Sequence, residues 1–149
     1  MAFRDHLADA QRISEPISVV SQIRERTAMS DGAAILFENL PGSPGHKAAV
    51  NVCMRDNLAR AWNVHPSELV DLMGWAMDNP SDDFEILDEG AAPVMQCSMN
   101  PVDLTQLPIP WHYPEDRGRY MSASIVIAEY EGVRNVSYHR QFIRDSDHV

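Results

Sequence analysis

Six consecutive residues near the end of the chain concentrate its polar chemistry. Segment 135–140 reads Asn-Val-Ser-Tyr-His-Arg and brings together an amide, a hydroxyl, a phenol, an imidazole and a guanidinium. It follows the apolar run 121–128 and a short connection that contains glycine, so we expect a hairpin whose second strand is polar. Polar groups beside an apolar strand cost free energy unless they bind something. Segment 135–140 is therefore the strongest candidate for a ligand site.

Two side chains of this segment suggest specific chemistry. The amide oxygen of Asn135 is a ligand type that hard divalent cations prefer, and it brings no charge. The guanidinium of Arg140 is permanently charged and planar, which suits two-point contact with a carboxylate or a phosphate. Each position also has an ordinary alternative. Arg140 could pair with an acid such as Glu129, Asn135 could form a turn, and His139 could be an exposed or hydrogen-bonded histidine.

The overall composition limits the class of protein. The chain has 149 residues, 44% of them apolar, and a formal net charge of −10. This length suffices for a hydrophobic core, and the acidic balance opposes binding to nucleic acid or to anionic membranes. No apolar run approaches the roughly 20 residues of a membrane helix, and the N-terminus lacks the apolar core of a secretory signal. We therefore expect a cytoplasmic protein.

Several cysteine, tryptophan and histidine residues are expected to be structural. Cys53 and Cys97 are far apart and lack Cys-x-x-Cys spacing, so we expect reduced, buried thiols. Trp62 and Trp75 lie on predicted helix faces and are expected in the core. Segment 111–116 (Trp-His-Tyr-Pro-Glu-Asp) contains a histidine and two acids, but its spacing fits no closed metal site and its proline indicates a loop. We assign it no chemistry.

Hydrophobic periodicity predicts a mixed helix and strand arrangement in the first two thirds of the chain. The expected elements are helices over residues 3–12, 14–27, 55–62 and 65–78 and strands over residues 33–37, 48–52 and 93–99. The helix over 65–78 should present a core face formed by Leu69, Leu72, Met73, Ala76 and Met77. The acidic segment 82–89 should be a solvated connection.

The last third of the chain predicts the opening of a second, β-rich unit. Prolines make residues 103–114 extended and irregular. The strand over 121–128 is apolar on both faces, so both should be buried. A hairpin alone is marginal in water, so either the polypeptide continues or a partner chain completes a barrel or sandwich. We expect an α/β domain over 1–99 and an incomplete β domain over 100–149.

Three blocks of sequence carry a family likeness. Residues 34–39 (Ala-Ile-Leu-Phe-Glu-Asn), 103–108 (Asp-Leu-Thr-Gln-Leu-Pro) and 132–140 (Gly-Val-Arg-Asn-Val-Ser-Tyr-His-Arg) resemble, in that order, the N-terminal third of UbiD-type decarboxylases. The third block is the most specific, because it places Asn-x-Ser-x-x-Arg after a hairpin turn. The resemblance implies a small N-terminal α/β domain followed by the first strands of a split β-barrel that binds a flavin.

The resemblance also implies an activity and its cofactors. UbiD-like carboxy-lyases remove or add carbon dioxide on aromatic or α,β-unsaturated carboxylic acids. The implied cofactor is prenylated FMN, which a flavin prenyltransferase supplies. A divalent metal, usually Mn²⁺, holds its phosphate, and K⁺ lies nearby.

Segment 135–140 carries the implied site. Asn135 matches the metal-binding position, and Val136 would offer its backbone carbonyl to the monovalent ion. The next three side chains match positions that line the cofactor, and these are Ser137, Tyr138 and His139. Arg140 matches an arginine that contacts the cofactor and takes part in catalysis. On a regular strand, residues 135 and 140 face opposite sides. We therefore predict a bulge or a strand end between Ser137 and Arg140.

The resemblance leaves alternatives open. The other metal ligands and both catalytic acids of the family have no counterpart in these 149 residues, so we expect the chain alone to be inactive. The Ser-aromatic-His-Arg pattern is similar to the archaeal branch that decarboxylates an anhydromevalonate phosphate. One alternative is a non-catalytic UbiD-like subunit or assembly module, and another is an FMN-binding split barrel of the flavin-reductase type. We expect a homo-oligomer, or completion by a longer UbiD-like chain.

Overall fold

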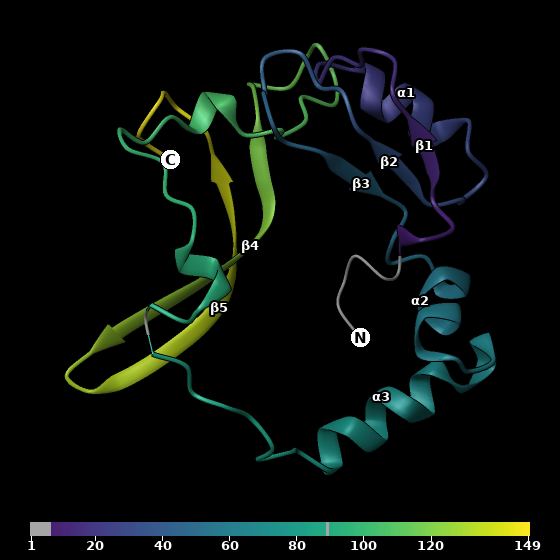
Figure 1. The fold of residues 1–149 in the computed structure, drawn as a ribbon, viewed down its shortest axis with the longest axis vertical. Helices are drawn as coiled ribbons and strands as arrows, with labels where there is room; N and C mark the ends of the chain where they lie inside the picture. The colour runs from purple at the N-terminus through teal and green to yellow at the C-terminus, as the bar shows by residue number, and fades with distance from the viewer. Residues whose placement is uncertain (1–6, 89) are drawn as a thin grey trace.

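The computed structural model describes residues 7–88 and 90–149, and within them two separate sheets are joined by a helical arm and long loops (Figure 1). The helices are α1 (Gln22–Ala28), α2 (Arg55–Trp62) and α3 (Leu69–Asp78). The strands are β1 (Gln11–Ile13), β2 (Ile35–Phe37), β3 (Ala48–Val50), β4 (Tyr120–Tyr130) and β5 (Val133–Phe142). Short 3₁₀ turns span Pro66–Glu68, Pro93–Met95 and Leu104–Gln106. The mixed α and β class expected from the sequence is confirmed.

The N-terminal sheet contains the best-packed core of the described residues. Its order is β1-β2-β3, with β1 parallel and β3 antiparallel to the central β2. Ile35 and Phe37 pack with Ile23 of α1 on one face, while Leu36 packs with Leu7 on the other. Because β2 is covered on both faces, its sequence is an unbroken apolar run rather than an alternating one.

The first two predicted helices are largely wrong. Residues 1–6 lie outside the described structure, and residues 11–13, predicted to end a helix, form β1 instead. The second helix begins at Gln22 rather than near Ser14, and residues 14–20 form no helix. Ile17 and Val19 are buried while Val20 is exposed, so the chain there follows the two-residue period of a strand. Within α1 itself, the buried residue is Ile23.

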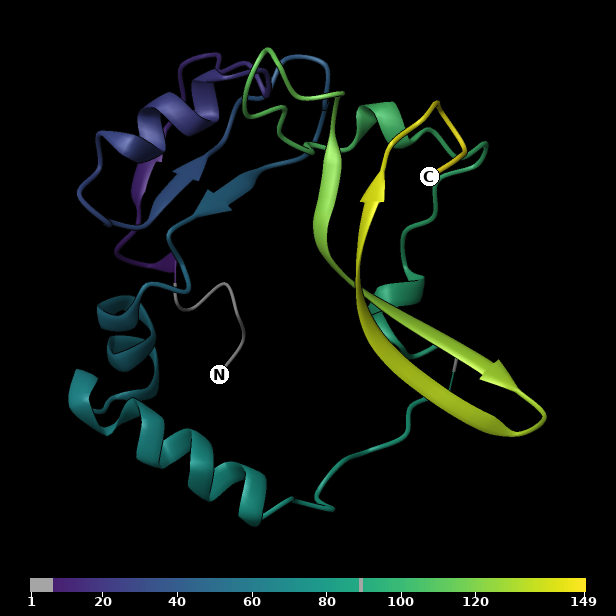
Figure 2. The same cartoon turned by 180° about the vertical axis from the view of Figure 1, so that it is seen from behind.

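The helical arm formed by α2 and α3 begins and ends close to the predicted residues. His65 caps the turn before α3, since its ring nitrogen accepts from the Ser67 N–H and its own N–H donates to Glu68 Oε2 at 2.8 Å. The predicted core face of α3 is wrong. Leu69 is buried, but Met73 is 52% and Met77 is 83% exposed. The helix runs away from the N-terminal sheet (Figure 2), and beyond the half-buried Leu72 its predicted core face is exposed among the described residues.

Other side chains that were predicted to be buried are also exposed, because the described residues do not cover them. Trp62 and Trp75, expected in the core, are exposed. Both cysteines, Cys53 and Cys97, are free thiols as expected, but they are exposed rather than buried. Amphipathic patterns show which side of an element prefers an apolar neighbour, and the described residues do not supply that neighbour.

The long connection between the two sheets is mostly irregular. The strand predicted over residues 93–99 is wrong: Pro93–Met95 forms a 3₁₀ turn, because proline cannot donate to a strand ladder and its fixed φ suits the first position of a turn. The acidic residues between 82 and 88 are exposed, as predicted. No helix within the described ranges is long and apolar enough to cross a membrane.

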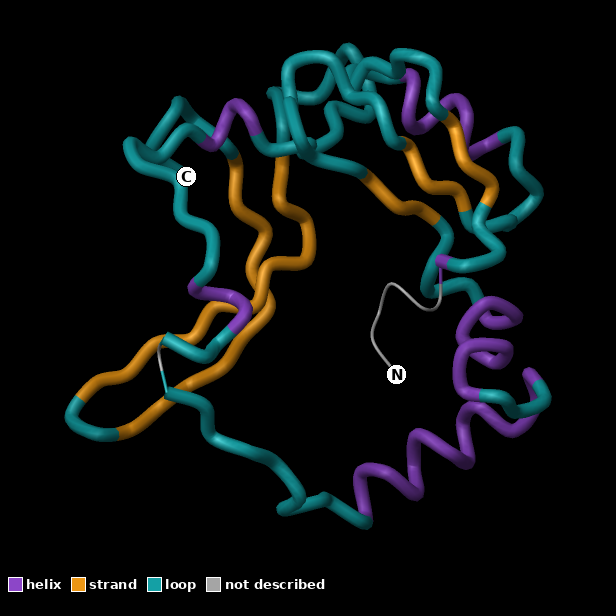
Figure 3. Tube along the Cα trace, in the orientation of Figure 1, coloured by secondary structure: helices purple, strands orange, loops and turns teal. Residues whose placement is uncertain are grey.

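The C-terminal sheet is a long, curved hairpin of β4 and β5 (Figure 3). Its two-residue turn places Glu131 and Gly132 at φ values of 49° and 76°, the left-handed conformations that a tight hairpin requires. The prediction that both faces of the first strand are buried is wrong, since Ile125 is 61% and Ile127 is 65% exposed. Among the described residues, two strands alone cannot bury both of their faces.

Candidate functional site

Strand β5 presents the candidate segment with the alternation expected of a strand. Ser137 and His139 lie on one face, where the histidine Nε2 and the serine Oγ are 2.9 Å apart. Val136 and Tyr138 occupy the intervening positions, paired with residues of β4, and both side chains are exposed. The structure therefore brings Ser137 and His139 into contact and leaves the two intermediate side chains open to a ligand or to further chain.

Asn135 lies close to the hairpin turn, opposite Ala128 of β4. Its side-chain amide makes no hydrogen bond with any residue that the structure describes. The alternative that Asn135 forms the turn fails, because Glu131 and Gly132 occupy the turn positions. Its amide oxygen is thus available to an external ligand.

The alternative proposed for Arg140 also fails. Glu129 pairs with Arg134, with 3.2 Å between Oε2 and Nη2, rather than with Arg140. Arg140 itself forms no ion pair or hydrogen bond with residues 7–88 or 90–149. An exposed guanidinium without a protein partner can bind a carboxylate or phosphate without first breaking an ion pair.

A hollow of about 590 Å³ lies at Arg140, and another of about 390 Å³ lies beside α1. The hollow at Arg140 is walled by the loop before β4 and by the start of β4. Its other lining residues are His112, Glu115, Asp116, Arg117, Tyr120 and Ser122. Asp116 is partly engaged, since its Oδ2 accepts from the Tyr113 N–H at 3.1 Å. Two arginines, Arg117 and Arg140, and two acids, Glu115 and Asp116, therefore line one open space.

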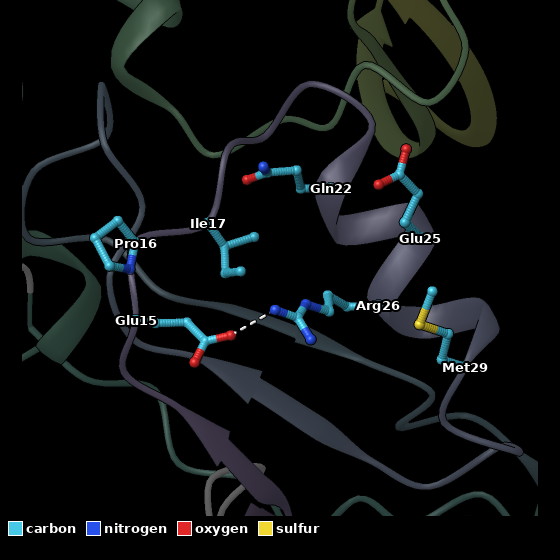
Figure 4. A pocket seen from close by; sticks show the side chains of 7 residues that line it. All are labelled: Glu15, Pro16, Ile17, Gln22, Glu25, Arg26 and Met29. Carbon is cyan, nitrogen blue, oxygen red and sulfur yellow. Dashed lines mark hydrogen bonds and ion pairs between the residues drawn. The ribbon is translucent and has the colours of Figure 1, made fainter.

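The hollow under α1 has no comparable open groups (Figure 4). Its Arg26 Nη2 lies 2.7 Å from Glu15 Oε1, and Gln22 Oε1 accepts from the Ser18 N–H at 2.7 Å. Because these polar groups are already paired, we assign this hollow no ligand.

A second polar cluster, formed by Asp145, Asp147 and His148, is exposed and internally paired. The hydrogen bond from His148 lowers the pKa of the Asp145 carboxyl, and the same contact raises the pKa of the His148 imidazole.

The bulge or strand end predicted between Ser137 and Arg140 is wrong, because β5 runs without interruption to Phe142 and the irregularity lies in β4. Met121 pairs with Gln141 and Ser124 with His139, so two residues of β4 stand opposite Arg140 alone. The bulge thus lies in β4, where it disturbs the ladder beside Arg140, while β5 stays continuous. Asn135 and Arg140 are five positions apart, roughly 17 Å along a strand. The structure does not bring these two side chains together, so only a long ligand could touch both.

The residues around Arg140 were not identified from the sequence. Tyr120 and Ser122 come from the adjacent strand, and their proximity depends on the register of the hairpin. The histidine and acids of segment 111–116 were noticed but were given no role. Their only signal was local concentration of polar groups, and the loop conformation that turns them toward Arg140 has no signature in sequence.

Comparison with known proteins identifies relatives of this chain and structures that share its fold. Residues 85–149 match the family model of the 3-octaprenyl-4-hydroxybenzoate carboxy-lyase Rift-related domain (UbiD). Anhydromevalonate phosphate decarboxylase of Methanosarcina mazei is 32% identical over 142 residues, which cover 95% of this chain and 31% of that protein. The protein of the same name from Archaeoglobus fulgidus is 30% identical, over 99% of this chain and 34% of its own. The chain therefore spans about a third of the length of these curated relatives.

Solved structures share the fold. The UbiD-class enzyme HmfF from Pelotomaculum thermopropionicum, an evolved dimeric form in complex with prFMN, superimposes with a TM-score of 0.81 and 29% identity, over 98% of this chain and 36% of that one. The apo 3,4-dihydroxybenzoic acid decarboxylase AroY of Klebsiella pneumoniae gives a TM-score of 0.83 at 20% identity, over 97% of this chain and 35% of its own, which shows a common fold. The family model thus places residues 85–149 in the UbiD family, and the aligned relatives and the shared fold extend the likeness over nearly the whole chain.

Proposed function

We propose that this chain forms part of a UbiD-like non-oxidative carboxy-lyase that acts on an α,β-unsaturated or aromatic carboxylic acid with prenylated FMN. The observation that carries the proposal is the open guanidinium of Arg140 above a hollow of about 590 Å³. The guanidinium is planar, permanently charged and in no ion pair with any of the described residues, so it is suited to hold a carboxylate in two-point contact. Prenylated FMN supplies the electron sink for the departure of carbon dioxide.

The proposed roles along β5 follow from its length. Asn135, at the turn end, would hold a divalent metal such as Mn²⁺ beside the cofactor phosphate, and the Val136 carbonyl would face K⁺. Arg140, roughly 17 Å away along the strand, would contact the reacting end. A flavin mononucleotide has its phosphate at one end and its ring at the other. Because residues 135 and 140 face opposite sides of the continuous β5, one molecule would serve both positions only if the twist of the hairpin turns both side chains toward it. The side chains proposed to line it are Ser137, Tyr138 and His139.

The proposal extends to substrate and partners. Two relatives named for anhydromevalonate phosphate favour an unsaturated acid that also carries a phosphate. We also propose a cytoplasmic homo-oligomer whose cofactor comes from a flavin prenyltransferase, and a domain division near residue 99.

A mutational test separates the roles of the two ends of β5. In the complete cofactor-loaded protein, Arg140→Ala should reduce decarboxylation at least about a hundredfold with the flavin still bound, because substrate orientation is lost. Asn135→Ala should lower the metal and flavin that copurify. Turnover, flavin absorbance and metal content are the measurements. Arg134→Ala is the matched control, since it removes an exposed arginine of the same strand that pairs with Glu129. Normal turnover of the Arg140 variant would refute the proposal.

A second candidate function is a non-catalytic UbiD-like subunit that docks on a longer chain. The exposed apolar side chains of the hairpin favour it, among them Ile125, Ile127 and Val136. In that case the protein binds its partner and shows no turnover with any acid. A reductase-type flavin protein would instead oxidise a nicotinamide and need no metal.

A further inference from the structure

We propose that Arg24 is a positioning residue that fixes one wall of the Arg140 hollow from the other sheet. Arg24 lies on α1, and its Nε–H donates to the carbonyl oxygen of His112 at 3.0 Å, across 88 positions of sequence. Its guanidinium carbon also lies 4.8 Å from the ring centroid of Tyr113. One side chain thus holds two consecutive residues of the loop that precedes β4.

The same loop is tied to the N-terminal sheet region by its backbone. The Trp111 N–H donates to the Val19 carbonyl at 3.0 Å, and its carbonyl accepts from the Ser21 N–H at 2.8 Å. These bonds form a bridge just before α1. The backbone hydrogen bonds to this region end at Trp111. The Arg24 side chain extends the attachment by two residues, to Tyr113.

Beyond this attachment the loop reaches the candidate site. Its residues 112 and 115–117 line the hollow at Arg140, and the Tyr113 N–H bonds to Asp116. Loops without such anchors sample many conformations, whereas a site needs its walls fixed. A guanidinium is suited to this task because its planar face stacks on a ring while its edge donates to a carbonyl. The nearest acid, Glu25, lies 3.6 Å away and competes only weakly.

The inference rests on the proposed function, because it takes the hollow at Arg140 as the place where the acid binds. If Arg24 holds the loop, its loss should weaken binding of the acid and leave the chemical step in place. Arg24→Ala should then raise KM about tenfold with kcat changed by less than about twofold, because a displaced loop wall weakens binding of the acid rather than the chemical step. Arg24→Lys keeps the charge but loses the planar fork, so its KM should be intermediate. Tyr113→Leu, which removes the ring, should raise KM in the same direction.

Arg26→Ala is the matched control. Arg26 lies on the same helix and is more exposed than Arg24, and it pairs with Glu15 (Figure 4). The variants are compared in the complete cofactor-loaded protein by steady-state kinetics, flavin content and thermal melting. An Arg24→Ala variant with the KM of the control overturns the inference. If Arg24→Ala does not fold, wild-type KM in both Arg24→Lys and Tyr113→Leu overturns it. Full turnover in Arg140→Ala would instead refute the proposed function, so the two failures are distinguishable.

Discussion

Single residues of the hairpin differ in how firmly their surroundings hold them. Ser137 and His139 hold each other, whereas Asn135 and Arg140 are free of partners within the described residues. Near the base of the hairpin the packing is closer. The Phe142 ring lies 5.1 Å from the ring of Tyr120, and Arg117 stacks above it at 4.7 Å. Two members of this small cluster, Arg117 and Tyr120, also line the hollow at Arg140.

Gly118 is the residue on which that cluster depends. It adopts φ +156°, and an added Cβ would lie 2.9 Å from Cε2 of Phe142. Gly118→Ala should lower the free energy of unfolding by about 1–2 kcal/mol, because the ring is already packed between two neighbours. Gly74→Ala is the control, since nothing lies within 4 Å of its added Cβ in α3, and it should be neutral or stabilising by about 0.5–1 kcal/mol. Urea denaturation measures both. Equal effects of the two substitutions would contradict this view of Gly118.

Among the secondary-structure elements, the N-terminal sheet is held at its edge by one carboxylate. Glu38 follows β2 and accepts from Arg12 Nη1 at 2.9 Å, from Ser14 Oγ at 3.1 Å and from Lys47 Nζ at 2.9 Å. These groups tie the ends of three strands together. The Lys47 contact, then the Ser14 hydroxyl, holds the pKa of the Glu38 carboxyl below its ordinary value of 4.5.

The pH dependence of this contact has a definite sign. Because folding lowers the pKa of Glu38, the unfolded chain takes up its proton at a higher pH than the folded chain. The stabilisation is therefore complete above pH 4.5 and is lost as pH falls from 4.5 through the folded pKa. Glu38→Gln should lower the melting temperature near neutral pH, and the difference from wild type should shrink toward about pH 3. Glu85→Gln, an exposed acid outside the sheet, should show no such trend. A difference that persists at low pH would rule out this role.

At the level of the whole molecule, apolar burial is uneven. The core of the described residues surrounds β2, where Phe37 is 0% and Ile35 is 1% exposed. The hairpin and α3 instead present apolar side chains to solvent, and the chain corresponds to about a third of its curated relatives. The N-terminal sheet has its own core, and the hairpin depends on contacts that the described residues do not make.

Hydrogen exchange would show this difference directly. In the 149-residue chain, backbone amides of β2 should exchange at least about a hundredfold more slowly than those in the middle of β4 and β5, because local opening of a two-stranded sheet is easy. Mass spectrometry of peptic fragments can measure both regions in one sample. Equal protection would mean that the hairpin is covered in solution, and a concentration series would then show whether a second copy covers it.

Local sequence determined some of this structure. The helix over 55–62, the central strand around residues 35–37, the tight turn at Gly132 and the strand nature of segment 135–140 follow from short-range patterns, because capping, turn conformation and period are properties of neighbouring residues. The family likeness likewise rested on three contiguous blocks. The roles of Asn135 and Arg140 follow from one of these blocks and remain predictions.

Tertiary structure decided the rest. Residues 11–13 became a strand because β2 offers a free edge, and the apolar face of α3 stayed exposed because the described chain has nothing to place over it. The hollow at Arg140 joins a loop, two strands and, through Arg24, a helix from the other sheet. These contacts depend on the register of the hairpin, the bulge in β4 and the path of a long irregular loop. Such features arise from packing between distant segments, which local propensity does not encode.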